Sequence, residues 1–128
     1  MHTARGTFYV TMHPEPPYSD RDGVVLARAV FDKTFRGALA ATGRVEFLSV
    51  RAGEHAAYVA LERIEGTLDG RAGSFVVTHR ARASSQGRSL EIDVVAGTGT
   101  GALVGLEGTI AIDIVDKVHH YTMTYSLP

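Results

Sequence analysis

An acid and a histidine interrupt two apolar stretches of the sequence, and together they could transfer a proton. The segment YVALERIEGTLDGRAGSFVVTH, residues 58–79, carries Glu62 and His79 among its apolar positions. A carboxylate and an imidazole that share a cavity form a plausible acid–base pair. The same groups can instead fasten two strands together, with Tyr58 completing a buried polar network. Both interpretations require that the two side chains face the interior.

The Asp69-Gly70 dipeptide predicts how these two groups lie. A type I′ turn needs positive φ at both central residues, which Asp-Gly tolerates, so we expect a hairpin with a two-residue loop. The resulting register pairs Leu68 with Arg71, Ile64 with Phe75, Glu62 with Val77 and Ala60 with His79. Glu62 and His79 then share the more apolar face, with Cβ atoms roughly 7–8 Å apart as diagonal neighbours. A slip of one residue would turn both side chains outward.

Further residues are candidates for contact with a ligand. Tyr121 and Tyr125 alternate with Met123 on the last expected strand, an interior stripe that favours a packed core over a ligand site. The pattern leaves open whether Glu46 faces the interior or solvent. The candidate catalytic residues are Glu62 and His79, and the candidate substrate-binding residues are Tyr58, Phe75, Tyr121, Tyr125 and Glu46.

The sequence contains few features that would support a metal or a cofactor site. The chain has no cysteine, which excludes thiolate ligands and nucleophiles, and the adjacent His119 and His120 would point to opposite faces of a strand. The glycine-rich segment GTGTGALVGLEG, residues 97–108, could bind an anion on backbone N–H groups. It lacks the lysine and the strand–helix–strand context of a P-loop, so a connection or a plug of the fold is the preferred interpretation. We expect neither a metal nor a cofactor.

Length and charge narrow the class of protein. A chain of 128 residues fits one domain. Its 13 basic and 14 acidic residues give a net charge of −1, which argues against a nucleic-acid partner. The N-terminus lacks the features of a signal peptide, and no apolar run reaches the roughly 20 residues that span a membrane. We therefore expect a cytoplasmic protein without a membrane partner.

Alternation with a period of two dominates the chain and predicts an all-β fold. The expected strands cover residues 6–13, 24–36, 39–50, 58–68, 73–83, 90–96, 108–115 and 118–127. Three prolines in residues 14–23 predict a loop, and Thr98 or Thr100 could cap one helical turn over residues 102–106. Eight closely spaced strands with so little helix favour a mainly antiparallel sandwich or barrel.

Three segments carry a resemblance to a bacterial family. YVALERIEGTLDGRAGSFVVTH, VVAGTGTGALVGLEG and HHYTMTYSL resemble the family called domain of unknown function 3224, and the resemblance covers nearly the whole chain. Its members look like small eight-stranded barrels similar to allene oxide cyclase. By analogy of fold, the resemblance implies a cofactor-free cyclase or isomerase that acts on an apolar metabolite in the barrel lumen. The alternative is a binding or structural barrel without chemistry.

Some expected strands are apolar on both faces, which suggests that the outer surface is covered by another protein. Such two-sided positions are Val24, Val25, Leu26, Val59, Leu61 and Val76. Two-fold assemblies are the commonest, so we expect a homodimer. The expected partners are thus a second copy and an apolar small molecule.

Overall fold

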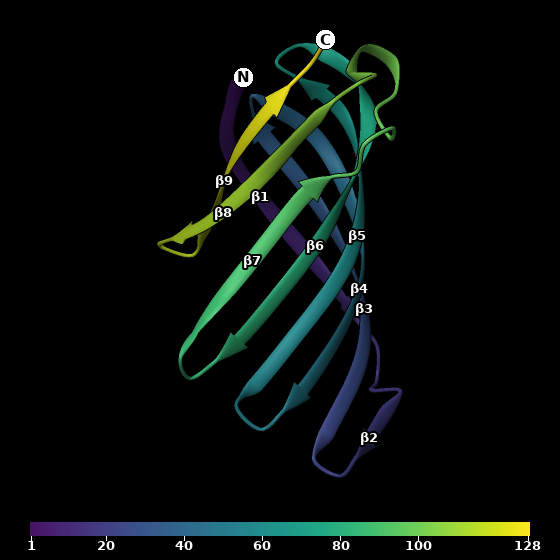
Figure 1. The fold of residues 1–128 in the computed structure, drawn as a ribbon, viewed down its shortest axis with the longest axis vertical. Helices are drawn as coiled ribbons and strands as arrows, with labels where there is room; N and C mark the ends of the chain where they lie inside the picture. The colour runs from purple at the N-terminus through teal and green to yellow at the C-terminus, as the bar shows by residue number, and fades with distance from the viewer.

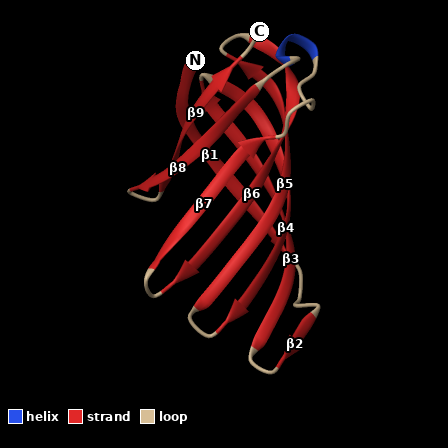
Figure 2. Ribbon diagram, in the orientation of Figure 1, coloured by secondary structure: helices blue, strands red, loops and turns tan.

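An antiparallel sheet that closes on itself makes up most of the computed structural model, which covers residues 1–128 (Figures 1 and 2). Its strands are β1 (His2–Pro14), β2 (Ser19–Arg21), β3 (Val24–Gly37), β4 (Leu39–Ala52), β5 (His55–Leu68), β6 (Arg71–Ser84), β7 (Gly87–Val94), β8 (Glu107–Val115) and β9 (Val118–Ser126). A short 3₁₀ turn, η1 (Gly101–Leu103), lies between β7 and β8. The strand order is β1-β9-β8-β7-β6-β5-β4-β3-β2, and pairing of β1 with β3 closes the barrel. The predicted all-β, eight-stranded barrel is confirmed, with β2 as an additional strand outside it.

Turn chemistry sets the register of the central hairpin as predicted. Asp69 and Gly70 have φ values of 49° and 81°, which fit the type I′ turn. In the β5–β6 pair, Ala60 lies opposite His79 and Glu62 opposite Val77. The interior face of this hairpin is therefore the one expected from the sequence.

The segment 14–23 is not entirely the loop that its prolines suggested. Ser19–Arg21 forms β2, which pairs with the start of β3. The reason is a second turn dipeptide, Asp22-Gly23, with φ values of 58° and 76°, which connects β2 to β3 and folds the chain back on itself. This correction adds a strand at the end of the sheet without changing the barrel.

The glycine-rich segment forms the expected plug, but its threonines do not cap a helix. The helical turn is shorter than expected, and Thr100 makes no capping bond. Instead, Thr100 Oγ1 accepts a hydrogen bond from Ser74 N (3.0 Å) and Thr98 Oγ1 accepts one from Val76 N (3.0 Å). The two hydroxyls thus attach the segment to β6, where Leu103 is fully buried in the core.

The two ends of the barrel are filled differently. One half, here called the packed half, lies next to η1 and both termini, at the top of Figure 1. Its core includes Phe8, Phe35, Leu39, Ile64, Leu68, Phe75, Leu103, Leu106, Tyr121, Met123 and Tyr125. The other half, here called the open half, lies toward the β4–β5 and β6–β7 turns at the bottom of Figure 1.

Small side chains leave the open half unfilled. Its outermost row of inner-facing residues across β3–β7 is Val25, Arg51, Ala56, Ala83 and Arg88, and the next row is Ala27, Ser49, Tyr58, Ala81 and Leu90. In addition, β7 and β8 are joined by a single residue pair, Asp93 with Thr109, so β8 separates from β7 toward this end (Figure 1).

The structure contains no helix that could span a membrane.

Candidate functional site

Glu62 and His79 meet inside the barrel. The Nε2 atom of His79 lies 2.8 Å from Oε1 of Glu62, and the two residues are only 5% and 1% exposed. The predicted interior position and the predicted interaction are therefore both present. An ionised carboxyl group at this depth is stable only when it is paired and hydrogen-bonded.

Lys33 is the second partner of Glu62, and the sequence analysis missed it. Its Nζ lies 3.1 Å from the same Oε1 atom, and its side chain is 9% exposed. The ammonium group also lies 4.7 Å from the ring centroid of Phe8, a cation–π contact. A signal was available, because Lys33 continues an alternation in which Ala29, Phe31 and Phe35 face inward.

The second oxygen of the carboxylate is unusual. Oε2 of Glu62 is buried and has no hydrogen-bond partner. It lies against Gly43 on the inner face of β4, where the Cβ of any other residue would overlap it. Gly43 therefore makes room for the carboxylate within the wall of the barrel.

Tyr58 connects this buried group to the open half. Its hydroxyl lies 3.5 Å from Nδ1 of His79, on the opposite side of the ring from Glu62. This arrangement suits a tautomer in which Nε2–H donates to Glu62 and Nδ1 accepts from Tyr58. Burial, and then the charge of Glu62, raise the pKa of Tyr58, so its hydroxyl keeps its proton at neutral pH.

A large cavity occupies the open half, and Tyr58 is part of its lining. Its volume is about 1040 Å³, and 12 of its 19 lining residues are hydrophobic. Tyr58 packs against Phe47, with ring centroids 4.5 Å apart, at the inner end of the cavity. Ile112 and Ile114 of β8 contribute on the side where β8 separates from β7. The chain of contacts from the cavity inward is Tyr58, His79, Glu62 and Lys33.

Three of the predicted substrate-binding residues lie in the packed half and contribute nothing to the lining of this cavity. Phe75 is enclosed by the core. The Tyr121 hydroxyl donates to Arg36 O (2.8 Å) and accepts from Leu39 N (2.9 Å). The Tyr125 hydroxyl donates to Asp69 Oδ2. The hydroxyls of both tyrosines are thus engaged in holding the barrel together, and only Tyr58 joins Glu62 and His79.

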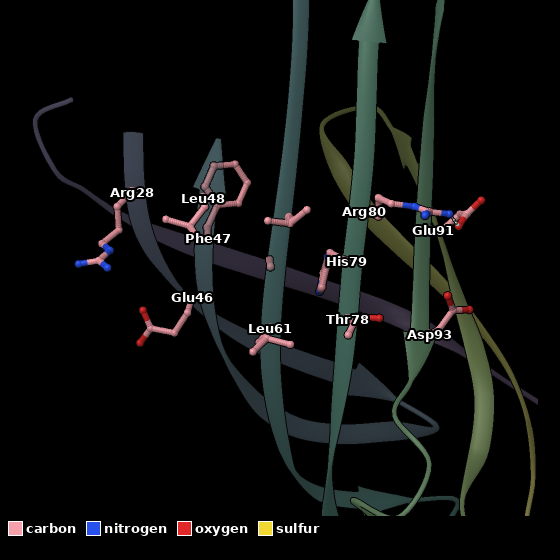
Figure 3. Close-up of a pocket in the computed structure, with 12 residues that line it drawn as sticks. Arg28, Glu46, Phe47, Leu48, Leu61, Thr78, His79, Arg80, Glu91 and Asp93 are labelled. Carbon is pink, nitrogen blue, oxygen red and sulfur yellow. Dashed lines mark hydrogen bonds and ion pairs between the residues drawn. The ribbon is translucent and has the colours of Figure 1, made fainter. Parts of the chain in front are cut away.

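Glu46, whose orientation the sequence left open, lies on the outer wall. Its side chain is 63% exposed, because the neighbouring Phe47 faces inward and alternate residues of a strand face opposite sides. It lines a shallow hollow of about 760 Å³ on the outside of β4–β7 (Figure 3). Arg28 and Asp93 lie at opposite sides of that hollow in the view of Figure 3. Glu46 is therefore separated from the interior cavity by the thickness of the sheet.

The side chains show no cluster of metal-ligand type. No group of three or more histidine, aspartate or glutamate side chains is arranged to hold an ion. The buried polar group is instead one carboxylate between an imidazole and an ammonium group. Such an arrangement can exchange protons and hydrogen bonds.

Comparison with known proteins agrees with the fold and the predicted family. The family model described as "Protein of unknown function (DUF3224)" matches residues 4–125. The chain is also similar to the crystal structure of a DUF3224-family protein of unknown function from Shewanella oneidensis MR-1, with 38% identity, a TM-score of 0.93, and coverage of 100% of this chain and 98% of that chain. No curated protein matches the sequence. Because the match extends over nearly the whole barrel, the chain belongs to the DUF3224 family.

Proposed function

We propose that the protein binds a largely apolar small molecule in the open half of the barrel, with Tyr58 as its polar contact. The observation that carries this proposal is the cavity of about 1040 Å³ in which Tyr58 is hydrogen-bonded to a buried histidine. Ligand sites of this kind are concave, mostly apolar and supplied with a few convergent polar groups. An interior that served stability alone would be filled by its own side chains, as the packed half is.

Filling the cavity tests this proposal. Ala81 lies in the row of Tyr58, so Ala81→Phe places an aromatic ring in the cavity. Native mass spectrometry with mixtures of apolar metabolites should show a bound species with the wild-type protein and none with Ala81→Phe. Ala40→Phe is the matched control, because Ala40 is exposed on the outer face of β4. Equal retention of ligand by Ala81→Phe and the wild type would contradict the proposal.

The buried group favours a second candidate, a cofactor-free isomerase or cyclase. In this scheme Tyr58 passes its proton to Nδ1 of His79, and the imidazolium is stabilised by the Glu62 carboxylate 2.8 Å from Nε2. In the same step the Tyr58 oxygen takes a proton from the ligand, so no free tyrosinate accumulates, and the return transfer delivers a proton to another atom of the ligand. The protein ends unchanged, as isomerisation or ring closure requires. Lys33 Nζ, 3.1 Å from the same oxygen, holds the carboxylate in position beside His79.

Glu62→Gln separates proton transfer from a structural role. The substitution keeps the shape of the side chain but removes the charge that stabilises the imidazolium. A catalytic pair predicts that turnover of a bound ligand is lost while stability changes little. A purely structural pair predicts a stability loss of about 1–3 kcal/mol. Urea unfolding and product analysis on the same variant distinguish the two results, and unchanged turnover would exclude the catalytic role.

The outer wall supports a proposal about partners, namely a second copy of this chain. Leu48, Val59 and Leu61 are large apolar residues that line this outer hollow and are 42%, 53% and 57% exposed. Arg28 lies on β3 and Asp93 on β7, two strands away from β5 on either side, and neither is in an ion pair. A two-fold axis along β5 would therefore bring Arg28 of one copy to within one row, roughly 7 Å, of Asp93 of the other, a distance that the long arginine side chain can span.

Light scattering tests the dimer. The wild type should be dimeric at micromolar concentration, and Leu61→Asp should be monomeric, because it places a charge at the centre of the apolar contact. Arg28→Asp should weaken the dimer, and the double variant Arg28→Asp/Asp93→Arg should restore it. A wild type that is monomeric at this concentration would exclude the interface.

A further inference from the structure

The entrance of the cavity is more basic than its interior. Its 19 lining residues include three arginines, Arg51, Arg82 and Arg88, and one acidic residue, Asp113. The remaining lining is apolar or small and uncharged. This local excess of positive charge contrasts with the net charge of −1 of the whole chain.

Two of these arginines belong to the inner face of the barrel. Arg51 on β4 and Arg88 on β7 stand in the same outermost row, separated by Ala56 and Ala83. The inner-facing residues directly below them are Ser49 and Leu90. Because adjacent strands lie about 4.8 Å apart, the two arginines flank the entrance from positions roughly 14 Å apart.

Neither guanidinium is neutralised within the chain. Seven ion pairs occur in the structure, and none includes Arg51 or Arg88. What distinguishes them from other unpaired arginines, such as Arg5 and Arg63, is their position in the lining of the cavity. Two unpaired guanidinium groups above an apolar cavity present donors that suit a carboxylate or a phosphate.

We propose that the ligand of the cavity is an anionic amphiphile, with its charged headgroup between Arg51 and Arg88 and its apolar chain directed inward. This inference rests on the proposed function and specifies the class of molecule that is bound. Successive rows of the inner face lie roughly 7 Å apart, since each residue of a strand advances about 3.3 Å. A headgroup at the arginine row therefore places the first few carbons of the chain beside Tyr58, one row further in.

Matched ligands that differ only in the headgroup test the inference. We expect decanoate and decyl phosphate to bind about ten-fold more tightly than 1-decanol at low ionic strength, with a smaller difference at high salt. The preference between decanoate and decyl phosphate shows which headgroup the two arginines favour. Isothermal titration calorimetry on the wild-type protein measures all three affinities.

Variants that remove the arginine charges test whether the preference for an anionic headgroup arises at the entrance of the cavity. Arg51→Gln/Arg88→Gln should bind decanoate and 1-decanol equally, with unchanged affinity for 1-decanol. Arg5→Gln/Arg63→Gln is the matched control, because it removes two exposed arginines without ion pairs from the outer surface. Equal binding of decanoate and 1-decanol to the wild type would overturn this inference and leave the proposed function standing. Absence of binding for all three ligands would overturn both.

Discussion

The packed half and the open half of the barrel use the same strands but have different interiors. In the packed half, inner-facing positions carry side chains such as Ile64 and Phe75, which are almost fully buried. In the open half, the same strands β5 and β6 carry Ala56, Ala81 and Ala83 at the corresponding positions. Strand pairing alone therefore maintains the wall of the open half. The size of the inner-facing side chains decides which half has a cavity.

The hydroxyl groups of two tyrosines, one in each half, also differ in how fully they are hydrogen-bonded. The Tyr121 hydroxyl is engaged with the backbone of Arg36 and Leu39. The Tyr58 hydroxyl has one contact, at 3.5 Å, with His79. A saturated hydroxyl contributes to stability, whereas one with a single long contact retains hydrogen-bonding capacity for another molecule. This difference between the two hydroxyls supports the proposed binding in the open half.

The largest predicted contrast comes from truncating one apolar residue in each half. Phe75→Ala should lower the free energy of unfolding by about 3–5 kcal/mol, because it leaves a void in a packed core. Leu90→Ala should cost less than about 1 kcal/mol, because Leu90 borders the existing cavity and is 41% exposed. Urea unfolding measures both values, and similar losses would contradict the division of the barrel into two halves.

A smaller contrast is expected when one hydroxyl is removed from each half. Tyr121→Phe leaves the buried N–H of Leu39 without its side-chain acceptor, so it should cost about 1–3 kcal/mol. Tyr58→Phe should cost less than about 0.5 kcal/mol, because only one long contact is lost. Thermal unfolding of the two variants would refute this comparison if Tyr58→Phe proved the more destabilising.

Alkaline pH should weaken the packed half through its buried tyrosines. Burial, and then the hydrogen bond to Asp69, raise the pKa of Tyr125 from 10.0 to about 12. The folded state thus holds this proton more tightly than the unfolded state. The resulting stability is fully present below pH 10 and is lost as the pH rises through about 12. Tyr125→Phe should show a smaller loss of stability over this range, and an unchanged loss would show that other groups cause it.

Local turn chemistry made part of this structure predictable. The Asp69-Gly70 turn fixes the register of β5 and β6, and with it the interior position of Glu62 and His79. The same chemistry at Asp22-Gly23 predicts β2, but the prolines before it concealed the signal. The sequence of this hairpin was therefore sufficient to predict the contact between Glu62 and His79, because both residues lie within the hairpin.

Contacts between distant strands were harder to predict. Lys33 reaches Glu62 from β3, and Gly43 accommodates the same carboxylate from β4, so this group depends on β3 and β4 in addition to the β5–β6 hairpin. The cavity depends on small residues distributed over β3–β6 and on the separation of β8 from β7. No single segment carries that information. For this reason the sequence could not exclude Phe75, Tyr121 and Tyr125 as ligand contacts, and the structure places them in the core at the other end of the barrel.

Alanine methyl resonances provide the most direct measurement of binding in the open half. Ala27, Ala56 and Ala81 line the cavity, whereas Ala4 is fully buried in the packed half. In a protein with isotopically labelled alanine methyl groups, titration with 1-decanol should shift the resonances of Ala27, Ala56 and Ala81 and leave that of Ala4 unchanged. Shifts confined to Ala4, or no shift of the three cavity methyls at saturating ligand, would contradict the account.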